Sequence, residues 1–328
     1  MSIQDDEIKQ KPSITQTIDS LREGGKEGVL PEAGVFYGLS SLVPADLKAL
    51  TPVWQALDGT YKHKILRALA EASETNFDLD YRAIGTLSLS DSDARVRQAA
   101  IETLWIDDTI AGMNQMIALA ENDPSTEVRA AALIALGRYI LEGELDHIPE
   151  NATQKAQEVA IRILKDEFQD VEVRRRALEA ISNSSHEIVP KAIKQAYHGA
   201  DRRMQVSAIY AMGRSCDEQW EETVLEELES DVAEMRYEAV RASGEMEIME
   251  AVPRLTRLVV DEDREVQAAA IWSLGEIGGR EAMRVLEALV EVAEENDDDD
   301  LLDAVEEALS NASLFSGDLF SLDDLEDA

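Results

Sequence analysis

Residue types that carry out catalysis or bind metals are few in this sequence and are not grouped. The four histidines are His63, His147, His186 and His198, and none has a partner histidine three or four residues away on one helix face. The single cysteine, Cys216, lies in "GRSCDEQW", where acidic neighbours raise the pKa of a thiol. No glycine-rich phosphate loop follows a strand pattern. These observations predict no catalytic residue, no metal site and no cofactor, and therefore a protein that is not an enzyme.

The arginine and aromatic side chains of this sequence point to the binding of a partner rather than to catalysis. Arginine, tyrosine and tryptophan are enriched among the residues that dominate the energy of protein interfaces. A strip of them is unexpected in a chain whose net charge is −37. The alternative is a solvated face on which the arginines offset nearby glutamates such as Glu179, Glu238 and Glu245. The residues that we expect to bind a partner are Arg138, Arg175, Arg176, Tyr210, Arg214, Tyr237, Arg241 and Trp272.

The positions of these side chains depend on a short motif that recurs along the chain. The motif "VQAAAIWSLG" has relatives such as "VRQAAIETLW" and "VRAAALIALG", and successive copies start 32, 45, 31, 31, 31 and 35 residues apart. A period of about 31 residues leaves room for a second helix and two turns. The sequence therefore predicts an all-α fold, a right-handed α-solenoid of stacked helical hairpins. The copies start at Val96, Val128, Val173, Met204, Met235, Val266 and Leu301.

Helical periodicity assigns a face to each position of the motif, counted as an offset from its first residue. Offsets 0, 4, 7 and 8 share the predicted buried face, and offset 4 is alanine in the six intact copies. Small residues there allow helices to approach closely. Offsets 2, 3, 6 and 10 point the opposite way, into the concave groove, and hold the eight predicted partner-binding residues. The glycines at offset 9 are expected to cap the helix ends: Gly137, Gly213, Gly244 and Gly275.

Arginines at offset 1 have a structural interpretation. They lie on the shoulder of the buried face, and aspartates precede them in the turns. We expect a ladder of turn aspartates and helix arginines that joins adjacent repeats, rather than a row of cations that binds a ligand. The arginines of this ladder are Arg97, Arg129, Arg174 and Arg236.

Two segments, "DPSTEVRAAALIALGRY" and "DEDREVQAAAIWSLGEIGG", resemble the short HEAT-like repeats first described in phycobilisome lyase subunits. The resemblance covers about residues 90–310 and implies a solenoid. It also provides the alternative function, a bilin lyase subunit or lyase-like chromophore chaperone. Deoxyhypusine hydroxylases are arrays of similar repeats with iron-binding His-Glu pairs at offsets 2 and 3. This chain has no such pair there, and its one His-Glu pair, His186-Glu187, lies in a predicted loop.

Four regions follow from these patterns. We predict a disordered N-terminal arm over residues 1–33, a helical N-terminal cap over 34–90, the HEAT-like repeat solenoid over 91–310, and an acidic-hydrophobic C-terminal tail over 311–328. In the tail, apolar residues alternate with acids, a pattern typical of a segment that folds on a partner. The residues of this tail motif are Leu314, Phe315, Leu319, Phe320 and Leu322.

Composition narrows the choice of partners. The net charge of −37 repels phosphate backbones and anionic lipids, so we expect no nucleic acid and no membrane. The N-terminus lacks the apolar core of a signal peptide, and a cytoplasmic protein is expected. The sequence thus predicts a non-enzymatic scaffold or adaptor that binds a protein or peptide partner in the concave groove, with possible docking of its own C-terminal tail.

Overall fold

The computed structural model describes residues 11–31 and 33–315, and every regular element within them is helical. The chain forms two compact units, Met1–Ala180 and Ile181–Ala328. The helices of the first unit are α1 (Ile14–Glu27), α2 (Ala33–Leu39), α3 (Pro44–Ala56), α4 (Gly59–Thr75), α5 (Arg82–Ser88), α6 (Ala94–Thr103), α7 (Ile110–Asn122), α8 (Thr126–Glu144), α9 (Glu150–Lys165) and α10 (Val171–Ile181). Those of the second unit are α11 (Val189–Tyr197), α12 (Arg202–Ser215), η1 (Glu218–Trp220), α13 (Glu221–Glu227), α14 (Ala233–Glu245), η2 (Met249–Ala251), α15 (Val252–Leu258), α16 (Arg264–Ile277), α17 (Gly279–Asn296) and α18 (Asp299–Phe315).

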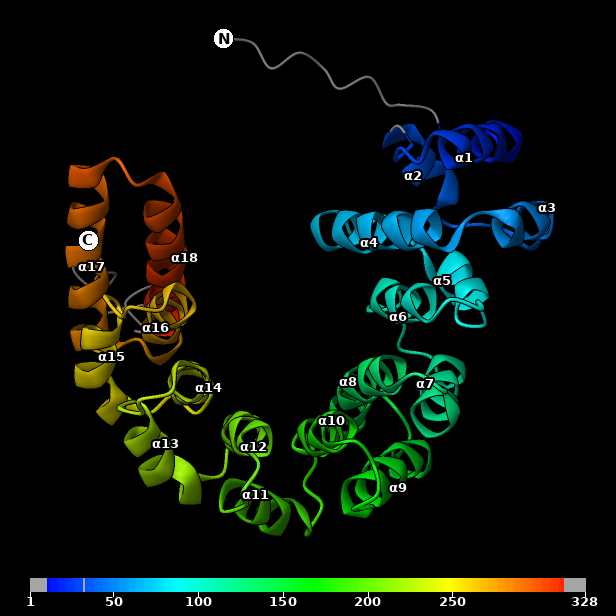
Figure 1. Ribbon diagram of the computed structural model, residues 1–328. Helices are drawn as coiled ribbons and strands as arrows, with labels where there is room; N and C mark the ends of the chain where they lie inside the picture. The colour runs from blue at the N-terminus through cyan, green and yellow to red at the C-terminus, as the bar shows by residue number, and fades with distance from the viewer. Residues whose placement is uncertain (1–10, 32, 316–328) are drawn as a thin grey trace, which may run out of the picture. The chain divides into compact units, whose positions relative to one another are not determined.

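Each copy of the repeated motif forms one helix, which we call a signature helix. In the second unit, the signature helices α12, α14, α16 and α18 pack side by side in chain order (Figure 1). In the first unit, α4, α6 and α8 do the same, and companion helices such as α7 pack against them. Each unit is therefore a stack of helical hairpins, and the predicted all-α solenoid is confirmed.

The alanine at offset 4 explains how closely the signature helices stack. All six of these alanines have no exposed surface. A larger side chain at this position would force neighbouring helices apart, because packed helix axes lie only about 8–10 Å from each other. The predicted buried face is therefore confirmed at its central position. The six alanines are Ala100, Ala132, Ala177, Ala208, Ala239 and Ala270.

The prediction that the offset-9 glycines cap the helix ends is wrong. Gly137, Gly213, Gly244 and Gly275 lie inside their helices, and α12, for example, continues to Ser215. The reason for glycine is close helix approach. A Cβ atom at Gly213 would lie 2.7 Å from Cα of Ala242 on the next signature helix, and one at Gly275 would lie 2.9 Å from Cα of Ala308. Gly213, Gly244 and Gly275 thus make room for the following helix.

The predicted ladder of aspartates and arginines is confirmed at two rungs. Arg97 forms two 2.7 Å hydrogen bonds to Asp123, which lies in the turn before the next signature helix. Arg236 binds Asp261 in the same way, at 2.8 and 2.9 Å. The offset-1 side chain also donates to a backbone carbonyl six residues earlier, at Asp91 from Arg97 and at Ser230 from Arg236. Arg129 donates to the backbone carbonyl of Asp123, and Arg174 to that of Leu164.

The structure differs from the prediction of a disordered arm over residues 1–33. Helix α1 begins with a capping box between Ser13 and Gln16, and it buries Ile18 and Leu21 on one face. Two satisfied backbone donors and an apolar stripe suffice to order a short amphipathic helix against α2 and α3. Residues 1–10 and 32 lie outside the described residues.

Both ends of the predicted solenoid also need refinement. Within the predicted cap, α4 packs on α6 as a signature helix would, so the hairpin stack begins before residue 91. At the other end, the backbone of Leu314 and Phe315 is the last turn of α18. Leu319, Phe320 and Leu322 lie outside the described residues, so the tail prediction remains open for them.

Candidate partner-binding site

The eight predicted partner-binding residues fall into two groups, one in each unit. Arg138, Arg175 and Arg176 belong to the first unit, on α8 and α10. The second unit holds the other five, on α12, α14 and α16. Within each group the structure brings most of the side chains together, but their surroundings differ greatly.

In the second unit the arginines are occupied by neighbours. Glu245 accepts from Arg214 at 3.4 Å and from Arg241 at 3.5 Å, while Arg214 also donates to Asn183 at 3.2 Å. The guanidinium of Arg241 stacks on the ring of Trp272, 4.5 Å from its centroid. The cation–π contact and the shared carboxylate thus engage both guanidinium groups.

Tyr237 and Tyr210 complete the second group. Burial tends to lower the pKa of Arg241, but its hydrogen bonds with Tyr237 and Glu245 outweigh that effect and raise it. Tyr210 is half-buried. The group is thus an internally bonded strip, and it fits the alternative of a face on which arginines offset glutamates.

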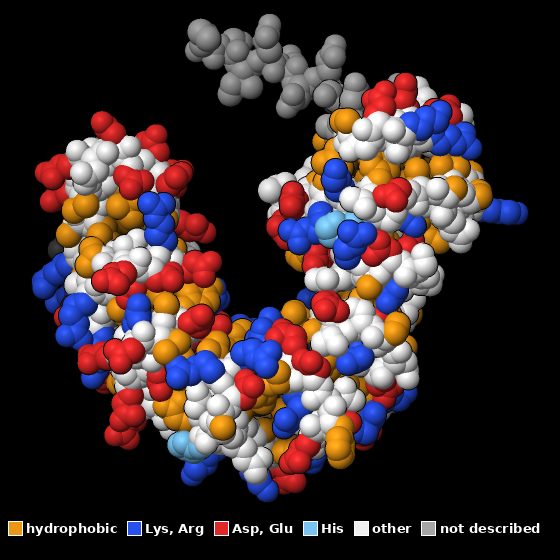
Figure 2. Space-filling model, viewed as in Figure 1, with side chains coloured by type: hydrophobic (Ala, Val, Ile, Leu, Met, Phe, Trp, Pro, Cys, Tyr) orange, Lys and Arg blue, Asp and Glu red, His pale blue; other side chains and the backbone are white. Residues whose placement is uncertain are grey.

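On α10, Arg175 and Arg176 form a four-residue ion cluster with Glu172 and Glu179. The N–O distances are 2.6 and 3.0 Å for Arg175 and 3.1 and 2.6 Å for Arg176. Burial raises the pKa of Glu172, but the hydrogen bond and charge of Arg175, with the charge of Arg176, outweigh it and lower the pKa. The cluster is neutral overall. Acidic and basic side chains are similarly interspersed over the visible face of the molecule (Figure 2).

An open pocket lies between α6, α8 and α10, within the first unit. Its volume is about 580 Å³, a size typical of ligand sites. The pocket occupies the face predicted for the groove, since its lining includes offsets 2 and 6 of α6 and offsets 2, 3, 6 and 10 of α8. Its apolar lining consists of Ile101, Leu104, Trp105, Met116, Ala130, Ala131, Ile134, Ala135 and Tyr139.

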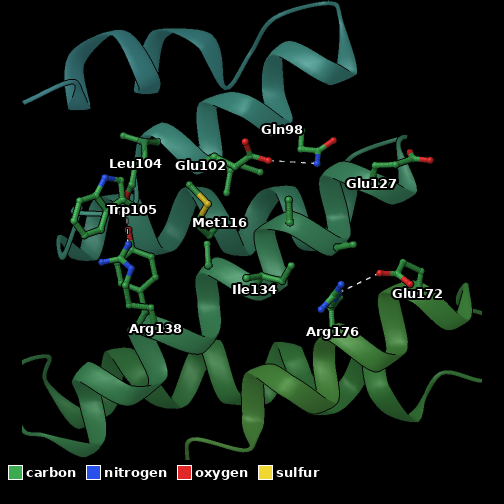
Figure 3. Close-up of a pocket in the computed structure, with 15 residues that line it drawn as sticks. Gln98, Glu102, Leu104, Trp105, Met116, Glu127, Ile134, Arg138, Glu172 and Arg176 are labelled. Carbon is green, nitrogen blue, oxygen red and sulfur yellow. Dashed lines mark hydrogen bonds and ion pairs between the residues drawn. The ribbon is translucent and has the colours of Figure 1, made fainter. Parts of the chain in front are cut away.

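Charged groups border this pocket at opposite ends. Figure 3 places Arg138 beside Trp105 at one end, and Glu127 and the Arg176–Glu172 pair toward the other, with Ile134 between them. Ile134 is 52% exposed, so the middle of the pocket presents apolar surface to water. The arrangement suits a segment with an apolar centre and a carboxylate at the Arg138 end.

Arg138 differs from the other arginines of the predicted set. It donates to the carbonyl of Leu104 at 3.3 Å and lies 4.6 Å from the ring centroid of Tyr139. Among the residues that the structure describes, no carboxylate forms an ion pair with it. Burial, with the charge of Asp107, raises the pKa of Tyr139 to about 12, so the phenol stays neutral beneath the guanidinium.

Sequence reasoning missed the apolar part of this pocket. Trp105 occupies offset 9 of its motif, where four later copies have glycine, and Ile134 occupies offset 6, like Trp272. Both residues are unusual for their offsets and so were a usable signal, but offset 9 lies outside the predicted groove face and isoleucine is neither arginine nor aromatic. Phe77, which is 80% exposed, adds a second ring 6.2 Å from that of Trp105. No sequence pattern pointed to it.

Other kinds of site find little support in the described part of the chain. No group of three or more histidine, cysteine or acidic side chains there is arranged to hold a metal ion. Desolvation and the charge of Glu245 raise the pKa of Cys216, which disfavours the reactive thiolate. None of the described helices combines the length and apolar character that a membrane span requires.

Comparisons with known proteins concern the fold. The family model for HEAT repeats matches residues 221–310. Solved structures similar to this chain include YibA from E. coli (17% identity, TM-score 0.44, 85% of this chain and 96% of that one). Another is the CpcE–CpcF complex of phycocyanin lyase from Nostoc (18% identity, TM-score 0.46, 70% and 94%). A third is importin beta (15% identity, TM-score 0.44, 92% and 45%).

A search of curated proteins finds no match. The structural likenesses are too distant to carry function from any of these proteins to this one. The architecture is nevertheless clear, since the family match spans α13 to most of α18 and the same hairpins recur in both units. The chain is therefore an all-α solenoid of HEAT-like hairpins, in which residues 221–310 match the HEAT-repeat family.

Proposed function

We propose that this protein is a cytoplasmic, non-enzymatic scaffold or adaptor that binds a protein or peptide partner through the pocket between α6, α8 and α10. Stacked hairpins suit this task, because they hold a row of helix faces rigidly and leave one side of each signature helix for a ligand.

The observation that carries the proposal is the exposed apolar surface at the centre of the pocket. Ile134 has a half-exposed side chain in a trough lined by Trp105, Met116 and several alanines. An apolar surface of this kind, rimmed by charges, is typical of an interaction site. Because the pocket is open to solvent at Ile134 and not enclosed, it fits a peptide segment better than a small molecule that must be surrounded.

Site-specific photo-crosslinking in the native host tests this proposal. A photoreactive phenylalanine analogue placed at Ile134 should yield a discrete crosslinked protein. The matched control carries the analogue at Val260, which is 74% exposed in the turn before α16 of the second unit and does not line the pocket. Identical crosslinking patterns at the two positions, or no product at Ile134, would contradict the proposal.

The non-enzymatic part of the proposal rests on the scattered histidines and the unreactive environment of Cys216. Purified protein should contain no stoichiometric iron or zinc, and chelation should leave its melting temperature unchanged. A bound transition metal whose removal lowers the melting temperature would overturn this part while leaving the crosslinking result untouched.

A further inference from the structure

We propose that the partner segment bound in the pocket between α6, α8 and α10 carries opposite charges at its two ends. It places a side-chain carboxylate on Arg138, apolar side chains over Ile134, and a lysine or arginine on Glu127. This inference rests on the proposed function, because it describes the partner of that same pocket. The two charges also set the direction in which the segment lies.

Three residues of α8 form a row along the pocket. Glu127, Ile134 and Arg138 all line it, and Arg138 follows Glu127 by 11 residues on the same helix. Eleven residues make about three turns, so the two charged residues lie on one face of α8, about 16 Å apart along its axis. Ile134 lies between them on this face (Figure 3). The row therefore carries an acid, an apolar side chain and a base, in that order.

The base at one end of the row can take a carboxylate from a partner. Arg138 donates to the carbonyl of Leu104 at 3.3 Å and lies 4.6 Å from the ring centroid of Tyr139. Within residues 11–31 and 33–315 it forms no ion pair. A carboxylate placed there would gain a charge-assisted hydrogen bond, which is stronger than a neutral one.

The acid at the other end of the row has no basic partner within the described ranges. Glu127 is exposed and accepts a hydrogen bond from Ser125 Oγ at 2.6 Å. That bond holds the pKa of Glu127 below its usual value, so the carboxylate is charged at neutral pH. The other acids of the lining differ, since Glu102 pairs with Arg67 at 3.3 Å and Glu172 pairs with both arginines of α10. A cation of the partner therefore fits at Glu127.

Apolar surface continues past the Arg138 end of the pocket. Trp105 lies beside Arg138 (Figure 3), and its Nε1 donates a 2.8 Å hydrogen bond to Ser73. Phe77, which is strongly exposed, lies with its ring 6.2 Å from that of Trp105 and extends the apolar surface beyond the pocket lining. We expect a partner segment to continue over these rings. The carboxylate on Arg138 then comes from a side chain within the segment rather than from the end of a chain.

A segment with one charge of each sign also suits a protein whose net charge is −37. This surface would repel a purely acidic segment, and a purely basic one would bind its many other acids as well. A segment with balanced charges avoids both effects. Its affinity then depends on the contacts in the pocket, and the two charges fix its register and orientation.

Selection from a random peptide library on the full-length protein tests this pattern. An extended peptide advances about 3.3 Å per residue, so peptides that bind the wild type should share an acid and a base about five positions apart. Large apolar residues should lie between the two charges. A library that yields peptides with apolar residues alone, or with charges of one sign, would contradict the proposal.

A selected peptide with blocked ends is then titrated into variants, and its fluorescence anisotropy is measured. Arg138→Glu should weaken binding at least about tenfold, because it places two like charges together. Glu127→Lys should weaken it severalfold, since this end is more exposed. The matched control is Arg284→Glu, at an exposed position of α17 in the second unit, and it should leave the affinity unchanged.

Charge reversal in the peptide assigns each end of the segment. A peptide whose acid is replaced by lysine should prefer Arg138→Glu to the wild type, and one whose base is replaced by glutamate should prefer Glu127→Lys. Arg138→Gln removes the charge without reversing it and should lose the preference for the acidic peptide over its lysine form. Arg138 is partly buried and Glu127 is exposed, so each variant should retain the helical circular dichroism signal.

The inference is overturned if no peptide is selected, if the selected peptides lack the paired charges, or if the variants at Arg138 and Glu127 bind them as the wild type does. Any of these results together with a crosslinked protein at Ile134 would remove this inference and keep the proposed function. Absence of both a crosslinked protein and a selected peptide would remove both.

Discussion

Arginine occupies offset 10 in both units, yet its environment differs between them. In the second unit, Arg214 is held between Asn183 and Glu245, which are themselves the offset-10 residues of the preceding and following motifs. Glu276 and Asn311 continue this row with a 3.4 Å hydrogen bond. In the first unit, Arg138 contacts a carbonyl and an aromatic ring, and no carboxylate of the described residues forms an ion pair with it.

Offset 6 shows the same contrast. Arg241 and Trp272 are successive offset-6 residues and stack on each other, whereas Ile134 at this offset lies half-exposed in a pocket. The offset within a motif therefore determines which face a side chain occupies. The residue at the same offset in the neighbouring motif influences whether that side chain is paired internally or stays exposed.

The largest expected effect tests whether the aspartate–arginine rungs stabilise the two units equally. Asp123→Asn in the first unit and Asp261→Asn in the second should each lower the free energy of unfolding by about 3–5 kcal/mol, because each leaves a largely buried arginine without its carboxylate. Chemical denaturation at pH 7 measures both losses. A large loss in only one unit would show that the rungs are not equivalent.

The stabilisation from the ion pair between Asp123 and Arg97 should depend on pH in a defined direction. Burial tends to raise the pKa of Asp123, but Arg97 and the Ser125 amide outweigh it and lower the pKa. The stabilisation is therefore complete above the usual aspartate pKa of about 4 and is lost as the pH falls through the lower folded value. The difference between wild type and Asp123→Asn should shrink in that acidic range. A difference that stays constant down to pH 2 would contradict the charged pair.

The next largest effect comes from overpacking the helix crossings. Ala132→Leu in the first unit and Ala208→Leu in the second should each cost about 1–3 kcal/mol, since both sites are fully buried. Ala268→Leu, at an exposed offset-2 position of α16, is the matched control and should cost little. Urea denaturation distinguishes them. If Ala268→Leu is the more damaging change, the assignment of faces is inverted.

Much of the fold could be predicted from the sequence because the motif repeats a strong local signal. Alanine at offset 4 implied close helices, and the structure shows each of the six fully buried. The helix ends were less predictable. Gly213 looked like a terminator, although its role is to admit Ala242 of the next helix, which is a contact between residues 29 positions apart. Helix α1 was missed because its apolar stripe is short among polar residues.

The candidate site was less predictable for a related reason. Residue types identified Arg138 and Arg214 as equivalent, and their offsets are the same. The two arginines differ only in the side chains around them, and these depend on how successive helices stack. Glu245 occupies offset 10 of the motif that follows that of Arg214. A comparison of adjacent motifs at this offset could therefore have identified it as a partner of Arg214. The exposure of Ile134 and the approach of Phe77 to Trp105 could not, because they depend on the three-dimensional packing of α4, α6 and α8.

A smaller effect compares the two offset-10 arginines directly. Arg214→Gln should lower stability by about 1 kcal/mol, since it removes one partly exposed ion pair and weakens the bond to Asn183. Arg138→Gln loses no ion pair, so its free energy of unfolding should stay within measurement error of the wild type. Equal losses for the two variants would mean that Arg138 is also held internally, and the distinction between the units would fail.

The smallest effect is the coupling between Arg241 and Trp272. A double-mutant cycle of Arg241→Gln and Trp272→Leu, measured by urea denaturation, isolates the stacking from the packing that each side chain makes alone. Partly exposed cation–π pairs are worth about 0.5 kcal/mol, and we expect a coupling of that size. The hydrogen bond of Arg241 to Glu245 is lost in both the single and the double variant that carry Arg241→Gln, so it cancels in the cycle. A coupling near zero would mean that the two side chains are not stacked in solution. The offset-6 row of the second unit would then be as open to a ligand as Ile134 is in the first, and both units would have to be treated as binding surfaces.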